Sequence, residues 1–154
     1  MAKVLIKKLD PAVKLPEYKT DGASGMDLIA FIKETINLEP KTSYLVPTGL
    51  SVAFSKDYEI QIRPRSGLAA KNNVSVLNTP GTIDSDYRGE IKVILFNHGN
   101  NEFIINNKDR IAQMVLTPII KAEFEEVDEL PDTIRGERGF GSTGRWVIFS
   151  AKIL

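Results

Sequence analysis

The sequence lacks several residue types and patterns that would point to particular protein classes. None of its 154 residues is a cysteine, so a disulfide framework and a thiolate metal site are both excluded. Lysine plus arginine number 20, as do aspartate plus glutamate, so no excess positive charge draws the chain to nucleic acid or a membrane. No run approaches the ~20 apolar residues of a membrane span, and residues 1–8 contain no signal-peptide apolar run. These absences favour a soluble, intracellular protein, which we expect to be cytoplasmic.

What the chain does contain is a series of short apolar segments separated by turn residues. Tyr58–Arg63 alternates cleanly, with Tyr58, Ile60 and Ile62 on one face. Further runs of strand length cover residues 4–9, 26–31, 44–52, 91–96, 102–105, 111–116 and 121–127. The best place for a short helix is residues 67–71. Many short strands at this spacing predict one all-β domain, a sandwich or barrel, over residues 1–154.

The chain changes character after about residue 128. Glycines become frequent and few side chains could build a core, so we expect a β-barrel core over about 1–128 and a mobile C-terminal arm over about 129–154. Such an arm suits a catalytic lid, although a disordered tail has the same composition. Phe140, between two glycines, could stack on a base. The groups that could hold phosphate oxygens are Arg135, Arg138, Ser142 and Thr143.

Residues 78–90 combine a turn with a carboxylate, an amide and an aromatic ring. Pro80-Gly81 is a strong turn signal, and the glycine leaves backbone amides open to a ligand. Asn78 offers a donor and an acceptor to a base edge, and Tyr87 offers a flat face to a sugar. Asp84 could orient and deprotonate a water. Taken alone, the segment fits equally an ordinary hairpin whose polar side chains satisfy their own backbone.

A third cluster directly follows the alternating strand. Arg65 provides a forked guanidinium, Ser66 a hydroxyl donor and Gly67 an accessible amide at the start of the expected helix. Together these groups suit a phosphate, although a lone Arg-Ser-Gly is more often a solvated turn.

Five separated segments resemble, in order, the five motifs of the homotrimeric deoxyuridine triphosphatases (dUTPases). They are residues 23–28, 64–69, 78–90, 109–114 and the glycine-rich 135–144. Any one of them could arise by chance, but five in this order and spacing are specific, and they span nearly the whole chain.

The resemblance implies a jelly-roll β-barrel that forms a homotrimer with three active sites shared between subunits. It implies hydrolysis of dUTP to dUMP and pyrophosphate with Mg²⁺ as cofactor, which limits uracil incorporation into DNA and supplies dUMP for thymidylate synthesis. No direct protein ligand to the metal is expected. The triphosphate would carry Mg²⁺, and Asp27 would reach it through water. Neither nucleic acid nor a membrane is an expected partner.

By similarity, each motif has a role at the site. Asp84 would activate the attacking water, and Tyr87 would pack on the deoxyribose and leave no room for a ribose 2′-hydroxyl. The groups expected to read uracil are Asn78, Gly81, Thr82, Ile83 and Lys92, with Phe140 stacking on the base. The groups expected to hold phosphates are Arg65, Ser66, Gly67 and Gln113, with Arg135, Gly141, Ser142 and Thr143 closing from the arm.

Three features depart from the family pattern. Lys108 stands where glycine usually precedes the Asp-Arg of the fourth motif, which should alter a turn rather than the chemistry. Arg138 replaces a small residue in the fifth motif and could tune lid closure. Residues 145–154 continue past the point where many members stop, and their apolar character suggests packing rather than a frayed tail.

Two other functions remain open at this stage. A dCTP deaminase would share the barrel and the hairpin but carries a glutamate in the following strand, where this chain has Ile94. A non-catalytic nucleotide-binding module would be favoured by loss of the carboxylate, but Asp84 is present. The sole histidine, His98, lies in a His-Gly-Asn turn and is expected at the surface.

Overall fold

The computed structural model describes residues 2–139 of the chain. The chain divides into two units, residues 1–120 and residues 121–154, and all the described strands and the helix belong to the first. These elements are β1 (Leu5–Lys8), β2 (Met26–Ile29), β3 (Ile36–Leu38), β4 (Ser43–Pro47), β5 (Leu50–Ala53), β6 (Tyr58–Arg63), α1 (Ser66–Asn72), β7 (Val74–Val76), β8 (Gly81–Ile83), β9 (Lys92–Asn97), β10 (Phe103–Ile105) and β11 (Arg110–Pro118).

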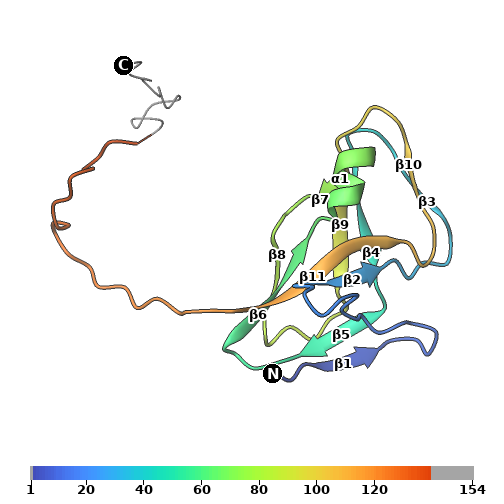
Figure 1. Ribbon diagram of the computed structural model, residues 1–154, viewed down its shortest axis with the longest axis horizontal. Helices are drawn as coiled ribbons and strands as arrows, with labels where there is room; N and C mark the ends of the chain where they lie inside the picture. The colour runs from blue at the N-terminus through green and yellow to red at the C-terminus, as the bar shows by residue number, and fades with distance from the viewer. Residues whose placement is uncertain (1, 140–154) are drawn as a thin grey trace, which may run out of the picture. The chain divides into compact units, whose positions relative to one another are not determined.

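The strands pair antiparallel in four groups (Figure 1). A four-stranded sheet has the order β2-β11-β6-β8, and a three-stranded sheet the order β4-β9-β7. Two further pairs are β1-β5 and β10-β3. The expected all-β architecture with one short helix is confirmed for the described residues. The arrangement is jelly-roll-like, but the four groups do not join into one closed barrel.

The core follows from the period-two pattern of the strands. In β6, Ile60 and Ile62 are buried, as the alternation predicts, while Tyr58 is half-buried. In β9, Val93 and Leu95 are buried, while Lys92 is exposed and Ile94 and Phe96 are half-buried. Since alternate side chains of a strand point to opposite faces, one face of each sheet supplies the core. The apolar clusters of the sheets merge into one hydrophobic core.

Among the buried polar residues, Asn97 is completely buried, and each polar atom of its side chain is hydrogen-bonded. Its Nδ2 donates to the backbone oxygens of Leu38 and Asn101, and its Oδ1 accepts from the Gly99 amide, at distances of 2.9, 2.8 and 2.8 Å. These bonds join the end of β9 to β3 and to the loop before β10. They also stabilise the fold, because a buried amide left without partners would be destabilising. His98, the next residue, is exposed as expected.

The predicted strand over residues 44–52 is two strands separated by a corner at Thr48 and Gly49. Gly49 has φ +68°, and a Cβ there would lie 2.5 Å from Val13 Cγ2. Only glycine fits this corner without strain, because the left-handed conformation and the close contact both exclude a side chain. The corner turns β5 away from β4 to pair with β1.

Other boundaries differ from the sequence predictions. The strand predicted over residues 121–127 is wrong, because residues 121–139 contain no strand. Phe124 and Ile134 are 94% and 98% exposed, so these apolar side chains are not buried in a core within residues 121–139. The compact first unit ends at Ile120, before the boundary near 128 that composition suggested. The single-domain organisation of residues 1–154 stays a prediction.

Three short strands, β3, β7 and β8, were not predicted from the sequence. Each has three residues, which is too few to show a period of two. The helix α1 includes the predicted residues 67–71. No helix in residues 2–139 has the length and apolarity needed to cross a membrane.

We expect the core around β9 to carry much of the stability. Replacing the fully buried Leu95 by alanine should lower the free energy of unfolding by about 2–5 kcal/mol, because the cavity adds to the lost burial. Replacing Ile104, which is 53% exposed, should change it by less than about 0.5 kcal/mol. Urea denaturation followed by far-UV circular dichroism measures both. Equal effects would contradict this assignment of the core.

Candidate active site

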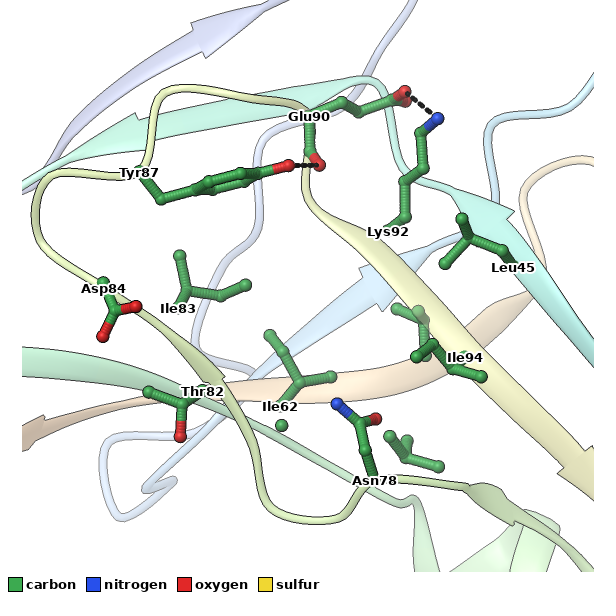
Figure 2. A pocket seen from close by; sticks show the side chains of 13 residues that line it. Leu45, Ile62, Asn78, Thr82, Ile83, Asp84, Tyr87, Glu90, Lys92 and Ile94 are labelled. Carbon is green, nitrogen blue, oxygen red and sulfur yellow. Dashed lines mark hydrogen bonds and ion pairs between the residues drawn. The ribbon is translucent and has the colours of Figure 1, made fainter.

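A pocket of about 260 Å³ opens at the hairpin of residues 78–90 and the start of β9 (Figure 2). Its polar side chains come from the loop before β8, the loop after it and the start of β9. Its apolar wall comes from β4, β6, β7 and β9. The lining residues are Leu45, Ile62, Val76, Asn78, Gly81, Thr82, Ile83, Asp84, Tyr87, Glu90, Lys92, Val93 and Ile94. Every hairpin residue proposed from the sequence is therefore at one pocket.

The turn into β8 presents the Asn78 amide to this pocket. The Thr79–Pro80 peptide bond is cis, and Gly81 is buried. A Cβ on Gly81 would lie 3.2 Å from Asn78 Nδ2 and 3.4 Å from Ile62 Cβ. The glycine thus allows the amide to lie against the backbone, a close approach for which turns commonly use glycine. The Asn78 side chain makes no hydrogen bond within residues 2–139, so both its donor and its acceptor can serve a ligand.

The turn after β8 carries the carboxylate and the aromatic ring. Asp84 is exposed at the end of β8, and the Tyr87 amide donates to its backbone oxygen at 3.1 Å. The Tyr87 hydroxyl donates to the Glu90 backbone oxygen at 3.1 Å, so the ring lies across the loop (Figure 2). A Cβ on Gly89 would lie 2.3 Å from this hydroxyl oxygen, so only glycine leaves room for the ring.

Two charged residues complete this pocket. Glu90 Oε1 accepts from the Gly49 amide at 2.8 Å, and its Oε2 lies 3.7 Å from Lys92 Nζ. Lys92 was proposed from the sequence, but Glu90 was not, because its position at the end of a turn gave no functional signal. Leu45 is also new to the site, since the pairing of β4 with β9 places it beside Ile94.

A second polar cluster joins the first, second and fourth sequence motifs. Asp27 of β2 accepts from Arg65 Nε at 2.9 Å and from Arg110 Nη1 at 3.2 Å. Arg65 Nη1 also donates to the Arg110 backbone oxygen at 3.2 Å. Asp27 and Arg65 are 17% and 24% exposed, so their ion pair is partly shielded from water and more favourable than a fully exposed one. The carboxylate holds two guanidinium groups side by side, with several N–H donors still unused.

The remaining phosphate candidates lie close to this cluster in the chain. Gln113 Nε2 donates to the Pro64 backbone oxygen at 3.0 Å, and a Cβ on Gly25 would lie 2.7 Å from Gln113 Oε1. Ser66 and Gly67 are exposed in the first turn of α1, with Arg65 at its N-cap. Neither they nor Arg65 and Gln113 line the hairpin pocket. Within one chain, the proposed uracil and phosphate halves are separate sites.

The donor set fits a metal ion that the substrate carries. No group of three or more histidine, aspartate or glutamate side chains in residues 2–139 could form a metal cage. Each oxygen of Asp27 accepts one guanidinium hydrogen bond, which still leaves lone pairs for metal-bound waters. Mg²⁺ usually keeps several waters and binds through few carboxylates plus phosphates, so these residues fit contact through water.

The C-terminal candidates belong to the second unit. Arg135 Nε donates to the Arg138 backbone oxygen at 2.8 Å, and Arg138 Nε donates to the Arg135 oxygen at 3.1 Å. Both side chains thus brace their own turn. Phe140, Gly141, Ser142 and Thr143 lie outside the described residues.

The comparisons with known proteins all point to one family. The family model described as dUTPase matches residues 12–144. The deoxyuridine 5′-triphosphate nucleotidohydrolase of Fusobacterium nucleatum is 54% identical over 146 residues, which covers 94% of this chain and 100% of the relative. The enzyme of the same name from Treponema denticola is 57% identical over 137 residues, covering 89% and 95%.

Solved structures agree with the fold. The dUTPase of Staphylococcus bacteriophage 80alpha, determined with dUPNHPP, is 26% identical with a TM-score of 0.83, over 93% of this chain and 99% of that one. A mutant dUTPase from phage phi11 of S. aureus, in which a structural Mg(II) ion is coordinated, has a TM-score of 0.76 at 22% identity over 84% and 99%. The second likeness supports the fold alone. On the family match, the identities and the shared fold together, this chain belongs to the dUTPase family.

Proposed function

We infer that this protein hydrolyses dUTP to dUMP and pyrophosphate. The observation that carries the inference is the hairpin pocket, in which Asp84, Asn78 and Tyr87 surround one cavity of nucleoside-sized dimensions. The strand that follows has Ile94 facing this cavity, where a deaminase of similar fold would carry its glutamate. This favours hydrolysis of the triphosphate over chemistry on the base.

Asp84 is the proposed general base. Its carboxylate would accept a proton from a water as the water oxygen forms a bond to the α-phosphorus. The bond from that phosphorus to the pyrophosphate oxygen breaks, and the pyrophosphate leaves with the electron pair. Such reactions depend mainly on positioning and charge neutralisation, so a fixed carboxylate is sufficient and no covalent nucleophile is needed.

Uracil would be read by the edge of β8 together with Asn78. Among the described strands, β8 is an edge strand of its sheet, because it pairs with β6 on one side only. The other edge presents backbone N–H and C=O groups at a fixed spacing, as in recognition by strand addition. Uracil carries two carbonyl acceptors and an N–H donor between them, which suits this edge and the adjacent amide.

Tyr87 would select the sugar. The hydrogen bond from its hydroxyl to the Glu90 backbone oxygen holds the ring across the hairpin, and Gly89 has no side chain that would displace the ring. A deoxyribose packed on the ring would leave no space for a 2′-hydroxyl. Selection therefore depends on how firmly the ring is held.

The phosphates require groups that one chain does not bring to the hairpin. We propose a homotrimer in which the Arg65, Ser66, Gly67 and Gln113 cluster of a neighbouring subunit completes each pocket, and Arg135 with residues 140–143 closes it. The separation of the two halves within the chain supports this arrangement. Mg²⁺ would neutralise charge on the triphosphate when bound, and Asp27 would contact its waters. The reaction would limit uracil incorporation into DNA and supply dUMP for thymidylate synthesis.

A panel of four nucleotides tests reaction and selectivity together. With Mg²⁺, we expect pyrophosphate release from dUTP and slower release from dCTP, dTTP and UTP. The rate with dCTP should be lower by ~10⁴ or more, because its amino group mismatches the polar groups that read uracil in a closed pocket. dTTP and UTP differ from dUTP by one methyl and one hydroxyl group, so lack of space must exclude them. Chromatography of the dCTP reaction detects any deaminated product. Robust conversion of dCTP to a uracil nucleotide would overturn the inference.

Asp84→Asn tests the general base. Loss of a general base typically lowers kcat by ~10² to ~10⁴, while the amide preserves shape and nucleotide binding. Single-turnover kinetics measure the rate, and calorimetry measures affinity for a non-hydrolysable analogue. Asp86→Asn is the matched control, because Asp86 is also exposed in this loop but does not line the pocket. Equal losses in both variants would argue against a specific role for Asp84.

Complementation tests the shared site. Asp84→Asn and Arg65→Ala should each be nearly inactive alone. If each pocket takes its hairpin and its phosphate cluster from different subunits, trimers assembled from an equal mixture should recover about a quarter of wild-type activity, since each half is intact in half of the subunits. Absence of recovery after verified subunit exchange would mean that both halves come from one chain.

A further inference from the structure

The loop that carries Tyr87 is anchored to the corner between β4 and β5. Two of the contacts are hydrogen bonds from side-chain hydroxyls to backbone oxygens. Thr48 Oγ1 donates to the Ile91 oxygen, and Ser51 Oγ donates to the Arg88 oxygen, both at 2.6 Å. The Ile91 amide donates to the Leu50 oxygen at 2.7 Å, and the Gly49 amide donates to Glu90 Oε1 at 2.8 Å. Each of residues 48–51, which are the corner and the first two residues of β5, thus makes a hydrogen bond to a residue within 88–91. We refer to residues 48–51 as the corner clamp.

The hydroxyl contacts of the corner clamp are shielded from water. Thr48 is 1% exposed and Ser51 is 7% exposed. Since water cannot easily replace a donor at such a place, removing either hydroxyl leaves a carbonyl with fewer partners and loosens the chain that carries it. The corner itself is rigid, because Gly49 adopts φ +68° against Val13 and Phe31.

The position of the Tyr87 ring depends on this anchored backbone. The only hydrogen bond of its hydroxyl in residues 2–139 is to the Glu90 oxygen, and its ring lies against Gly89. Tyr87 as a whole is 45% exposed, so core packing does not fix its side chain. Arg88 Nη1 donates to the Ser85 and Tyr87 oxygens, which stiffens the loop internally but does not tie it to the sheets. The corner clamp therefore ties the chain that follows Tyr87 to the body of the fold.

We propose that Thr48 and Ser51, which lie outside all five sequence motifs, are positioning residues for sugar selection. They hold residues 88–91 so that Tyr87 stays close enough to β8 to exclude a 2′-hydroxyl. The proposal rests on the proposed function, since it assigns the corner clamp a role in choosing dUTP over UTP.

Removal of one hydroxyl at a time tests the proposal. The variants are Thr48→Val, which keeps the shape of the side chain, and Ser51→Ala, with Thr48→Ser as the conservative rescue. Thr42→Val is the matched control, because Thr42 Oγ1 donates to the Glu39 backbone oxygen at 2.8 Å in a turn that does not line the pocket. Two quantities are measured for each protein: the ratio of kcat/KM for dUTP to that for UTP, and amide hydrogen exchange over residues 85–91 without ligand.

We expect the dUTP-to-UTP ratio to fall by about 3- to 10-fold in Thr48→Val and Ser51→Ala, which is the rate equivalent of one lost hydrogen bond. Amide exchange over residues 85–91 should rise in the same two variants. Thr48→Ser and Thr42→Val should keep both quantities within about twofold of wild type, even where Tm falls. A purely structural role would lower Tm and leave the ratio unchanged.

The outcomes separate this proposal from the proposed function. An unchanged ratio in an active Ser51→Ala or Thr48→Val protein overturns the positioning role, as does unchanged amide exchange over residues 85–91. If the wild type does not hydrolyse dUTP, the proposed function fails. The exchange measurement still decides whether the corner clamp holds the loop, and Ser51→Ala decides it alone if Thr48→Val does not fold.

Discussion

The hairpin pocket depends on how the backbone of residues 81–91 is hydrogen-bonded on its two flanks. On one flank β8 pairs with β6, and on the other the returning chain bonds to the corner between β4 and β5. Between these two anchors the loop is free to present Asp84 and Tyr87 outward. A turn held on one flank only would fold back and satisfy its own polar groups, which is the ordinary fate of Asp-rich and Asn-rich turns. The two-sided anchoring turns a hairpin into a binding surface.

Charge is arranged differently in the other half of the candidate site. Asp27 is only 17% exposed, and it places the guanidinium groups of Arg65 and Arg110 side by side. Two adjacent cations repel each other, so the carboxylate between them stabilises the pair and fixes its geometry. An arriving polyanion then meets donors that are already oriented. Such a preorganised cluster loses little conformational entropy on binding.

Much of the fold was predictable because the longer strands show either alternation, as β6 does, or an apolar run of strand length, as β9 and β11 do. β6, β9 and β11 were each predicted at nearly their observed bounds, as was the short helix α1. β3, β7 and β8 were not predicted, because three residues are too few to show a period of two. They form only because neighbouring strands offer backbone hydrogen-bond partners. The predicted strand over residues 121–127 fails for the complementary reason. A segment of strand-like composition becomes a strand only beside a partner, and residues 121–139 contain no strand that could be one.

The sequence by itself determined the family, the turn at residues 78–81 and the identity of the chemical groups at the hairpin, because these depend on local residue types and their spacing. Only the tertiary structure decided which groups meet. It brought Leu45 and Ile94 to the hairpin, joined Asp27 to two arginines and kept that cluster apart from the pocket. It also gave Thr48 and Ser51 their contacts with the Tyr87 loop. Such contacts join residues about 40 positions apart, and their geometry is set by strand pairing, which no local pattern encodes.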